Sequence, residues 1–312
     1  MMPHAPVMKD EMLEMLAPKD NGTYIDGTFG AGGYSHAILS SADCRVFAID
    51  RDPSTREFAK KLEAEFPSRF VWLLGNFADM CSLAAAHGVT EADGIVLDLG
   101  VSSMQIDQPG RGFSFKNDGP LDMRMSQQGM SAADIINNAP EQELADILYY
   151  YGEETAARRI ARAIVETRAD EKITGTRQLA DIIRKTIGNS GKTDPATRSF
   201  QALRIHVNQE LESIEGGLKA AESMLAPGGR LVVVSFHSLE DRLTKRFFYS
   251  RCGRLGEQSR HMPTKHEVPA ASRFFMPKPE KRVASEAEIA RNPRSRSATL
   301  RTMGREVETT HP

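Results

Sequence analysis

The first hundred residues alternate short apolar segments with longer amphipathic ones, and this alternation restricts the possible folds more than any other feature of the sequence. The apolar segments have the length of β-strands and cover 23–26, 45–50, 70–74 and 94–99. The segments between them repeat apolar residues at helical spacing and cover 35–41, 53–66 and 77–87. Strands joined by helices form a parallel sheet, so the sequence predicts an α/β fold.

The alternation stops near Gln105 and resumes near residue 205. Within this block the sequence predicts helices, at 131–137, 142–150, 155–167, 176–187 and from Pro195 onward. We therefore expect an α/β core whose first part is 1–105, an inserted smaller helical domain over 106–204, and a second part of the core over 205–312. In that second part we expect a long helix over 207–224, a strand over 230–236, a short helix beyond Asp241 and a last strand over 297–303.

Apolar residues recur every four positions in segment 200–211, at Leu203, Val207 and Leu211. This spacing predicts one continuous helix that turns these side chains toward a core. Three polar residues fall outside this stripe, namely Arg204, Asn208 and Glu210. We expect them to reach the junction between the insertion and the core.

The formal net charge of −2 hides a strong segregation of basic residues. Segment 242–305 contains 16 Lys and Arg against 5 Glu, and segment 153–205 contains 11 basic and 7 acidic side chains. Concentrated basic charge beside a neutral or acidic core is typical of proteins that bind phosphate backbones. A basic face that is simply solvated has the same composition, so nucleic acid is an expectation and no more.

Other sequence features exclude several classes of protein. The longest apolar run, 231–236, is far shorter than the roughly 20 residues that span a membrane. Residues 1–9 do not have the pattern of a signal peptide, so we expect a cytoplasmic protein without membrane contact. The cysteines Cys44, Cys81 and Cys252 are widely spaced, which argues for reduced thiols and against a zinc site, so no metal is expected.

Four glycines occupy the connection between the first predicted strand and the first helix, in the segment 24–35. Glycine allows main-chain groups to approach a ligand closely, which makes Gly32, Gly33 and the adjacent Tyr34 candidate cofactor-binding residues. A tight structural turn would need the same residues, and a nicotinamide cofactor would suit the pattern as well.

Three further strand ends carry candidate ligand-binding residues. Asp50 ends the second strand, where a carboxylate can accept hydrogen bonds from both hydroxyls of a ribose. Phe77 follows the third strand and could flank an adenine, and Asp98 ends the fourth. The element Pro227-Gly228-Gly229 before a late strand favours S-adenosylmethionine over a nicotinamide, because class I methyltransferases have a similar turn.

Several long motifs resemble the MraW family of bacterial 16S rRNA cytosine-N4 methyltransferases. They cover 4–8, 26–35, 98–103, 111–115, 119–125, 200–211, 235–242 and 292–297, whereas 253–288 shows little family motif. The resemblance implies a class I, Rossmann-like, doubly wound methyltransferase sheet with the helical insertion as substrate-recognition domain. It also implies contacts to S-adenosylmethionine at a defined set of residues: Gly32, Gly33, Tyr34, Asp50, Phe77, Asp98 and Gln105.

The same resemblance implies methyl transfer to the exocyclic N4 of a cytidine in the decoding region of 16S rRNA in the small ribosomal subunit. Such an amine needs a hydrogen-bond acceptor and a group that takes its proton, and we expect Asp98 and His237 as the catalytic residues. Asp98 could equally serve the cofactor alone, and His237 could contact phosphate or be purely structural. A homodimer is possible.

The chain departs from the Asp/Asn-Pro-Pro-Tyr/Phe motif of many amino-group methyltransferases, because Leu99-Gly100-Val101 follow Asp98. A stacking partner for the base must then come from elsewhere, and the candidates are Phe113, Phe115 and Tyr34, unless these aromatics belong to the core. Arginines that could meet phosphate, or could equally form ion pairs, are Arg124, Arg204 and Arg242.

Other functions fit parts of the sequence. The enzyme could methylate another RNA, DNA or a protein. The chain could also be a non-catalytic RNA-binding or ribosome-assembly factor that senses S-adenosylmethionine. A dehydrogenase is disfavoured by the Pro227-Gly228-Gly229 element and by the basic C-terminal tract.

Overall fold

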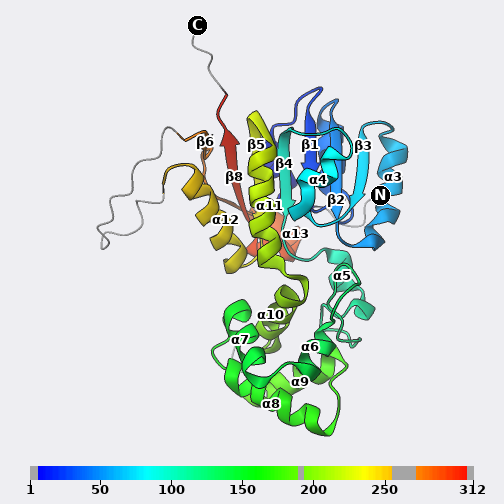
Figure 1. Ribbon diagram of the computed structural model, residues 1–312, viewed down its shortest axis with the longest axis vertical. Helices are drawn as coiled ribbons and strands as arrows, with labels where there is room; N and C mark the ends of the chain where they lie inside the picture. Colours follow the sequence, from blue (N-terminus) through cyan, green and yellow to red (C-terminus); the bar gives the residue numbers. More distant parts are fainter. Residues whose placement is uncertain (1–5, 189–192, 255–271, 308–312) are drawn as a thin grey trace. The chain divides into compact units, whose positions relative to one another are not determined.

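The computed structural model describes residues 6–188, 193–254 and 272–307. The chain divides into two compact units, which we call the core unit (1–100 and 211–312) and the inserted unit (101–210) (Figure 1). Residues 4 and 5 of the first family motif, and residues 255–271 of the segment with little family motif, lie outside the described residues.

The core unit contains one sheet with the strand order β3-β2-β1-β4-β5-β8-β6. Five strands run parallel: β1 (Thr23–Asp26), β2 (Arg45–Asp50), β3 (Phe70–Leu74), β4 (Ala92–Asp98) and β5 (Leu225–Ser235). β8 (Thr299–Arg305) pairs antiparallel with β5, and the short β6 (Phe274–Phe275) and β7 (Arg282–Val283) pair antiparallel with β8. The predicted parallel α/β sheet is confirmed.

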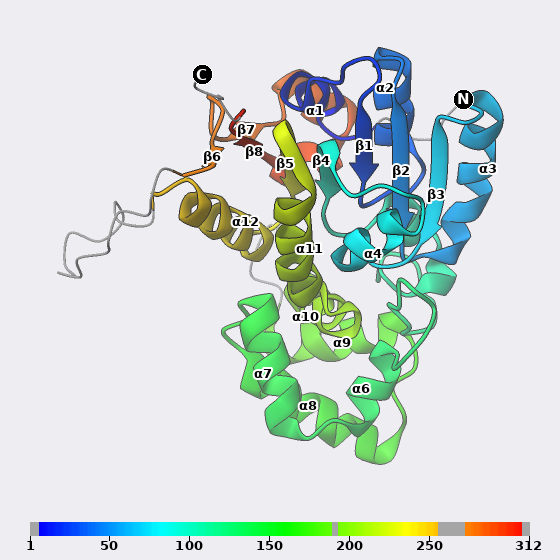
Figure 2. The same ribbon diagram turned by 45° about the horizontal axis from the view of Figure 1, so that its top comes forward.

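Helices cover both faces of this sheet, because the central strands carry apolar side chains on both faces. On one face, Tyr24 and Val232 pack with α1 (Lys9–Leu16), α2 (Gly33–Ser41) and α3 (Arg56–Glu65). On the other, Ile25 and Val233 pack with α4 (Met80–Ala85), α11 (Glu210–Met224) and α12 (Ser238–Arg251). Figure 1 shows α4 and α11 in front of the sheet, and Figure 2 brings α1 and α2 into view. The sheet is therefore doubly wound, as expected.

The inserted unit is helical and has a hydrophobic core of its own. Its helices are α5 (Ser103–Asp107), α6 (Ala132–Asn138), α7 (Glu141–Gly152), α8 (Ala157–Asp170), α9 (Thr176–Ile187) and α10 (Ala196–Asn208). Within its described residues the only β-type pairing is an isolated bridge between Pro120 and Gly175. The unit extends from 101 to 210, whereas the sequence placed the insertion at 106–204.

The continuous helix predicted over 200–211 is wrong. α10 ends at Asn208, and Gln209 adopts a left-handed conformation with φ of 48° before α11 begins. Asn208 is 3% exposed, and its amide accepts a hydrogen bond from Met125 N and donates to the carbonyl of Met123. These hydrogen bonds satisfy the buried amide of Asn208 and hold the end of α10 in place.

Two further elements differ from the prediction. The late strand begins at Leu225 instead of Arg230, because Leu225 already pairs with Ala92 of β4 and the register shifts before Arg230 pairs with Gly94. The helix expected beyond Asp241 begins at Ser238 and continues to Arg251. Among the described residues, no helix combines the length and the apolar character needed to cross a membrane.

Candidate active site

The connection from β1 to α2 forms a glycine cradle at the carboxyl end of the sheet. Gly32 has a φ of +83°, and a Cβ atom there would lie 2.9 Å from the ring of Phe29. A Cβ on Gly33 would lie 2.9 Å from Pro6. Only glycine suits the first position, and the amides of this turn lead into the positive end of α2, where a carboxylate or phosphate binds favourably.

Asp26 lies beneath this turn and is fully buried. Its carboxylate accepts hydrogen bonds from Ser35 Oγ at 2.7 Å and from Thr28 N at 3.2 Å. Burial raises the pKa of Asp26 to about 6, and the two hydrogen bonds oppose that rise. The two hydrogen bonds to this buried carboxyl group therefore fix the conformation of the glycine cradle.

Replacement of Asp26 by asparagine should remove a pH-dependent loss of stability. Because the folded-state pKa lies above the ordinary value of 3.8, the native state holds a proton that the unfolded chain releases between about pH 4 and 6. The free energy of unfolding should fall by about 3 kcal/mol from this group as the pH rises through that window. Urea unfolding at pH 4, 5, 6 and 8 checks this, and identical pH dependences for wild type and Asp26→Asn would contradict it.

Asp50 ends β2 beside the cradle. Its Oδ2 accepts a hydrogen bond from Gly30 N at 2.7 Å, and its Oδ1 accepts one from Asp52 N at 2.8 Å. Burial raises the pKa of Asp50 to about 7. Each carboxylate oxygen can accept a second hydrogen bond, so the group can still receive the two hydroxyls of a ribose.

Phe77 follows β3, where Asn76 caps a short 3-10 helix (Phe77–Asp79) by accepting a hydrogen bond from Ala78 N at 3.0 Å. The Phe77 ring is half-buried and packs against Gly217 of α11, where a Cβ atom would lie 2.3 Å from the ring. The glycine therefore supports one side of the aromatic ring.

Asp98 is the half-buried last residue of β4. Its backbone N–H donates to Thr28 Oγ1 at 2.6 Å, which ties the strand end to the glycine cradle. The carboxylate oxygen Oδ1 is shielded from solvent and has no hydrogen-bond partner among the described residues. Burial, and next the negative charges of Asp26 and Glu240, raise the pKa of Asp98 well above its usual range. A shielded acceptor without a donor indicates a place for a ligand donor group.

His237 follows β5, the strand beside β4. Leu99 N donates to the Val234 carbonyl at 2.9 Å, so the ends of β4 and β5 lie together. The His237 side chain is 11% exposed, and its Nε2 lies 3.0 Å from Oε1 of Glu240. Its other ring nitrogen, Nδ1, is buried and has no partner among the described residues.

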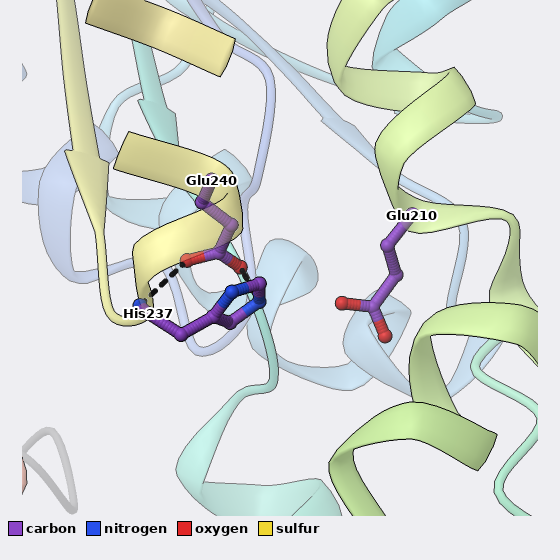
Figure 3. A group of neighbouring side chains, drawn as sticks. All are labelled: Glu210, His237 and Glu240. Atoms are coloured by element: carbon purple, nitrogen blue, oxygen red, sulfur yellow. Dashed lines mark hydrogen bonds and ion pairs between the residues drawn. The ribbon is translucent and has the colours of Figure 1, made fainter. Parts of the chain in front are cut away.

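Glu240 fixes the turn that carries His237. Its side chain is fully buried, and Oε2 accepts hydrogen bonds from the backbone N–H of Phe236 at 2.7 Å and of His237 at 3.2 Å. Figure 3 shows this carboxylate between the imidazole and the backbone of the turn. The arrangement can hold an imidazole with one nitrogen toward a carboxylate and the other available to a ligand.

Tyr34 does not present a free ring. The side chain is 4% exposed in the hydrophobic core, and its hydroxyl donates to the Val7 carbonyl at 2.5 Å. The expectation that this ring could stack on a base is therefore wrong, although its backbone remains part of the cradle. Phe115 packs edge to face on Phe200 with ring centroids 4.8 Å apart, and Phe113 is partly buried against the core of the inserted unit.

Two of the arginines considered for phosphate binding form ion pairs instead. Arg124 Nε and Nη2 donate to the carboxylate of Asp122 at 2.9 and 2.7 Å. Arg204 Nε and Nη2 donate to Glu210 at 2.8 and 2.9 Å, and Glu210 is 6% exposed. The Glu210 carboxylate is therefore buried with a charged partner. Arg242 also has an interaction partner.

Gln105 belongs to the inserted unit, where it is 6% exposed. Its Oε1 accepts a hydrogen bond from Ser102 N at 3.1 Å, and Ser102 Oγ accepts one from Gln105 N. This capping box starts α5 and fixes the direction of the side chain. The predicted contact of Gln105 with a cofactor stays a prediction.

Sequence reasoning missed three residues that shape the site: Thr28, Gly217 and Glu240. Thr28 stands inside the glycine-rich segment, where its hydroxyl gave no separate signal. Gly217 is one of two adjacent glycines in a helix, an unfavourable position that usually has a packing reason and could have drawn attention. Glu240 stands three residues after His237, the spacing of neighbours on a helix, which could have identified the pair.

Comparison with known proteins agrees with these features. The sequence matches the MraW methylase family over residues 1–306. Ribosomal RNA small subunit methyltransferase H of Paramagnetospirillum magneticum is 54% identical over 306 residues, which are 97% of this chain and 96% of that protein. The protein of the same name from Rhodospirillum rubrum is 54% identical over 311 residues, which are 97% of this chain and 94% of that protein.

Among solved structures, an rRNA methylase from Streptococcus thermophilus aligns with a TM-score of 0.41 and 10% identity, covering 96% of this chain and 94% of that one. That similarity is too low to support an inference. The family match over almost the whole length, together with relatives of similar length at 54% identity, shows that this chain belongs to the MraW methylase family.

Proposed function

We propose that the chain transfers a methyl group from S-adenosylmethionine to the exocyclic N4 of a cytidine in the decoding region of 16S rRNA. Family membership supports a methylase, and the 54% identical relatives are named as methyltransferases of small-subunit ribosomal RNA. The main structural support for this function is Oδ1 of Asp98, which lies beside the glycine cradle. This oxygen is shielded from solvent and has no hydrogen-bond partner among the described residues. An amine of the substrate would supply the missing donor.

The residues around the cradle fit the cofactor. The amides at Gly33 and Tyr34 would receive its carboxylate, and Gly32, whose own N–H donates to the Phe29 carbonyl at 2.8 Å, would let it approach the backbone. Asp50 would accept hydrogen bonds from its ribose hydroxyls, and Phe77 would cover one face of its adenine. We also assign Gln105 to this group of contacts. The bound cofactor supplies an electrophilic methyl group on a sulfonium, which is why the proposal includes no metal.

Replacement of Gly217 by alanine should weaken cofactor binding, because the new Cβ would stand 2.3 Å from the Phe77 ring and displace it. We expect an affinity for S-adenosylhomocysteine about tenfold lower, the effect of a lost stacking contact. Gly216→Ala is the matched control, since its Cβ would meet only Ala78 at 3.0 Å. Calorimetric titration of both variants measures the difference. Equal affinities in the two variants would remove Phe77 from the site.

Asp98 Oδ1 would accept a hydrogen bond from the N4 amine and so align its nitrogen with the methyl group. His237 would take the proton that the amine loses, through Nδ1, while the buried carboxylate of Glu240 stabilises the charge on the ring. This relation between a carboxylate and an imidazole sets which ring nitrogen carries the proton.

Glu240→Gln should therefore reduce the rate constant without a matching change in KM. A glutamine amide facing Nε2 would donate to it and so place the imidazole proton on Nδ1, which could then no longer accept one. We expect kcat about 10²-fold lower. Thr244→Ala, which also alters a buried polar side chain of α12, is the control for a general loss of structure. Unchanged kcat in Glu240→Gln would exclude this role.

We propose that the inserted unit recognises the RNA. Arg158 and Arg162 are exposed one turn apart on α8. Arg159, between them, donates to the carbonyl of Thr186, which adjoins the exposed Lys185 of α9. Basic side chains grouped on two packed helices suit phosphate contacts.

We further propose that the small ribosomal subunit is the substrate particle and that the protein acts in the cytoplasm. A homodimer is compatible with this proposal.

The test is incubation of the purified protein with methyl-labelled S-adenosylmethionine and small ribosomal subunits that lack the modification. Nucleoside mass spectrometry should find N4-methylcytidine at one position. Label on another nucleoside would indicate a different substrate atom. Cofactor binding without any label on subunits or free rRNA would instead favour the non-catalytic assembly factor.

A further inference from the structure

Two adjacent tyrosines stand out on the surface of the inserted unit. Tyr149 and Tyr150 of α7 are 57% and 65% exposed. Their rings lie edge to face with centroids 5.2 Å apart and an interplanar angle of 80°. The helix packs apolar residues such as Leu144 and Leu148 into the core of the unit, and the two tyrosines are not part of that core. Paired aromatic rings that large are rarely left in water without a partner.

The charges around this pair are negative. Asp146 precedes both tyrosines by one helical turn. Glu143 is exposed one further turn toward the start of α7, and the sequence of the helix contains no lysine or arginine. We call these four residues the acidic tyrosine face: Glu143, Asp146, Tyr149 and Tyr150.

Two basic side chains of the described residues contact the ends of α7. Arg198 Nη1 donates to the backbone carbonyl of Glu153 at 3.3 Å, and Arg162 Nε lies 3.8 Å from the carboxylate of Glu141. Within α7, Asp146 accepts a hydrogen bond from Gln142 at 2.9 Å. Glu143 and Asp146 are both exposed, so two negative charges lie on the same side of the helix as the tyrosine rings.

We propose that the acidic tyrosine face binds an arginine- and lysine-rich segment of a partner protein. A guanidinium or ammonium group placed over an exposed tyrosine ring is attracted by its π-electrons, and the carboxylates of Asp146 and Glu143 would pair with the same or neighbouring cations. Single-stranded RNA would also stack on the rings, but its phosphates would be repelled by these carboxylates. Charge complementarity therefore favours a basic protein over a nucleic acid.

Binding of a basic segment to this face goes beyond the proposed function and does not rest on it. Together with the phosphate contacts proposed for Arg158, Arg162 and Lys185 on α8 and α9, it would give the inserted unit one surface for phosphates and one for cations. A protein with both surfaces can hold a particle composed of nucleic acid and basic protein at two chemically distinct places. Binding at two places raises the affinity for such a particle more than either contact does alone.

The test uses the full chain without cofactor and two fluorescent probes, a peptide of alternating arginine and glycine and a single-stranded oligonucleotide of mixed sequence. Fluorescence anisotropy would compare wild type with Tyr149→Ala/Tyr150→Ala and with Glu143→Gln/Asp146→Asn. Met130→Ala removes another exposed apolar side chain of the same unit and serves as the first control. Glu166→Lys, on the exposed side of α8, is the control for a change of net charge.

We expect both double variants to bind the peptide about tenfold more weakly than wild type and than the two controls. The exposed positions should leave the melting temperature close to that of wild type, which separates lost binding from lost folding. Equal peptide affinity in wild type and in the tyrosine variant would overturn the proposal. So would an RNA affinity that falls in the tyrosine variant while the peptide affinity stays. Because no methyl transfer is measured, neither result depends on the proposed enzyme activity.

Discussion

Replacement of Asp98 by alanine is expected to lower the rate constant for methyl transfer by about 10²–10⁴-fold at saturating cofactor. The variant loses the shielded Oδ1 acceptor that would align the substrate amine, and the N–H of residue 98 keeps its bond to Thr28, so the cradle should persist. Transfer of label from S-adenosylmethionine to small subunits measures the effect, and titration with S-adenosylhomocysteine measures cofactor affinity separately.

Asp98→Asn is the matched variant, because an amide retains one acceptor oxygen but carries no negative charge. A rate constant that recovers when cofactor is saturating would show that Asp98 serves cofactor binding alone. The wild-type rate should also rise with pH, because the pKa of Asp98 lies well above its usual range and only the ionised carboxylate is a full acceptor. Asp98→Asn should lack the part of this rise that comes from residue 98, because its amide does not ionise.

Removal of the inserted unit is expected to abolish methyl transfer while the core unit still binds S-adenosylhomocysteine. Each unit has its own hydrophobic core, so residues 101–210 can be replaced by a flexible linker without opening the core of the sheet. Linkers of about 12 and about 24 glycine and serine residues would test different spans, on the order of 20 to 30 Å. Surviving transfer to the same nucleoside would show that recognition lies in the core unit.

A milder variant separates recognition from folding. The exposed residues Arg158, Arg162 and Lys185 can be changed together to glutamate. Lost phosphate contacts should weaken subunit binding and reduce its dependence on salt concentration. A variant with wild-type salt dependence would place the phosphate contacts elsewhere. Cofactor affinity, measured in parallel, should stay unchanged.

Much of the fold could be predicted because the information is local. Strand-sized apolar runs that alternate with helical periodicities predicted β1 to β4 nearly residue by residue. Each run is apolar because that one segment is buried between two layers of helices. The errors occurred where a contact distant in sequence overrides the pattern. The helix predicted across 200–211 ends at Asn208, whose amide bonds to Met123 and Met125, more than eighty residues away.

The candidate site divides in the same way. The glycine turn, Asp50 and Asp98 could be placed at one edge of the sheet from sequence, because parallel strands end together. The support of Phe77 by Gly217 and the orientation of His237 by Glu240 could not. Those depend on which side chains meet once helices pack on the sheet.

By itself, the sequence determined the parallel α/β core, the helical insertion and the resemblance to a methylase family, because periodicity and long motifs are properties of the chain alone. Only the tertiary structure decided that Tyr34 is buried and that Arg204 is neutralised by Glu210. It alone revealed the unpartnered oxygen of Asp98. The physical reason is that burial and hydrogen-bond satisfaction are set by neighbours in space, which residue spacing along the chain does not specify.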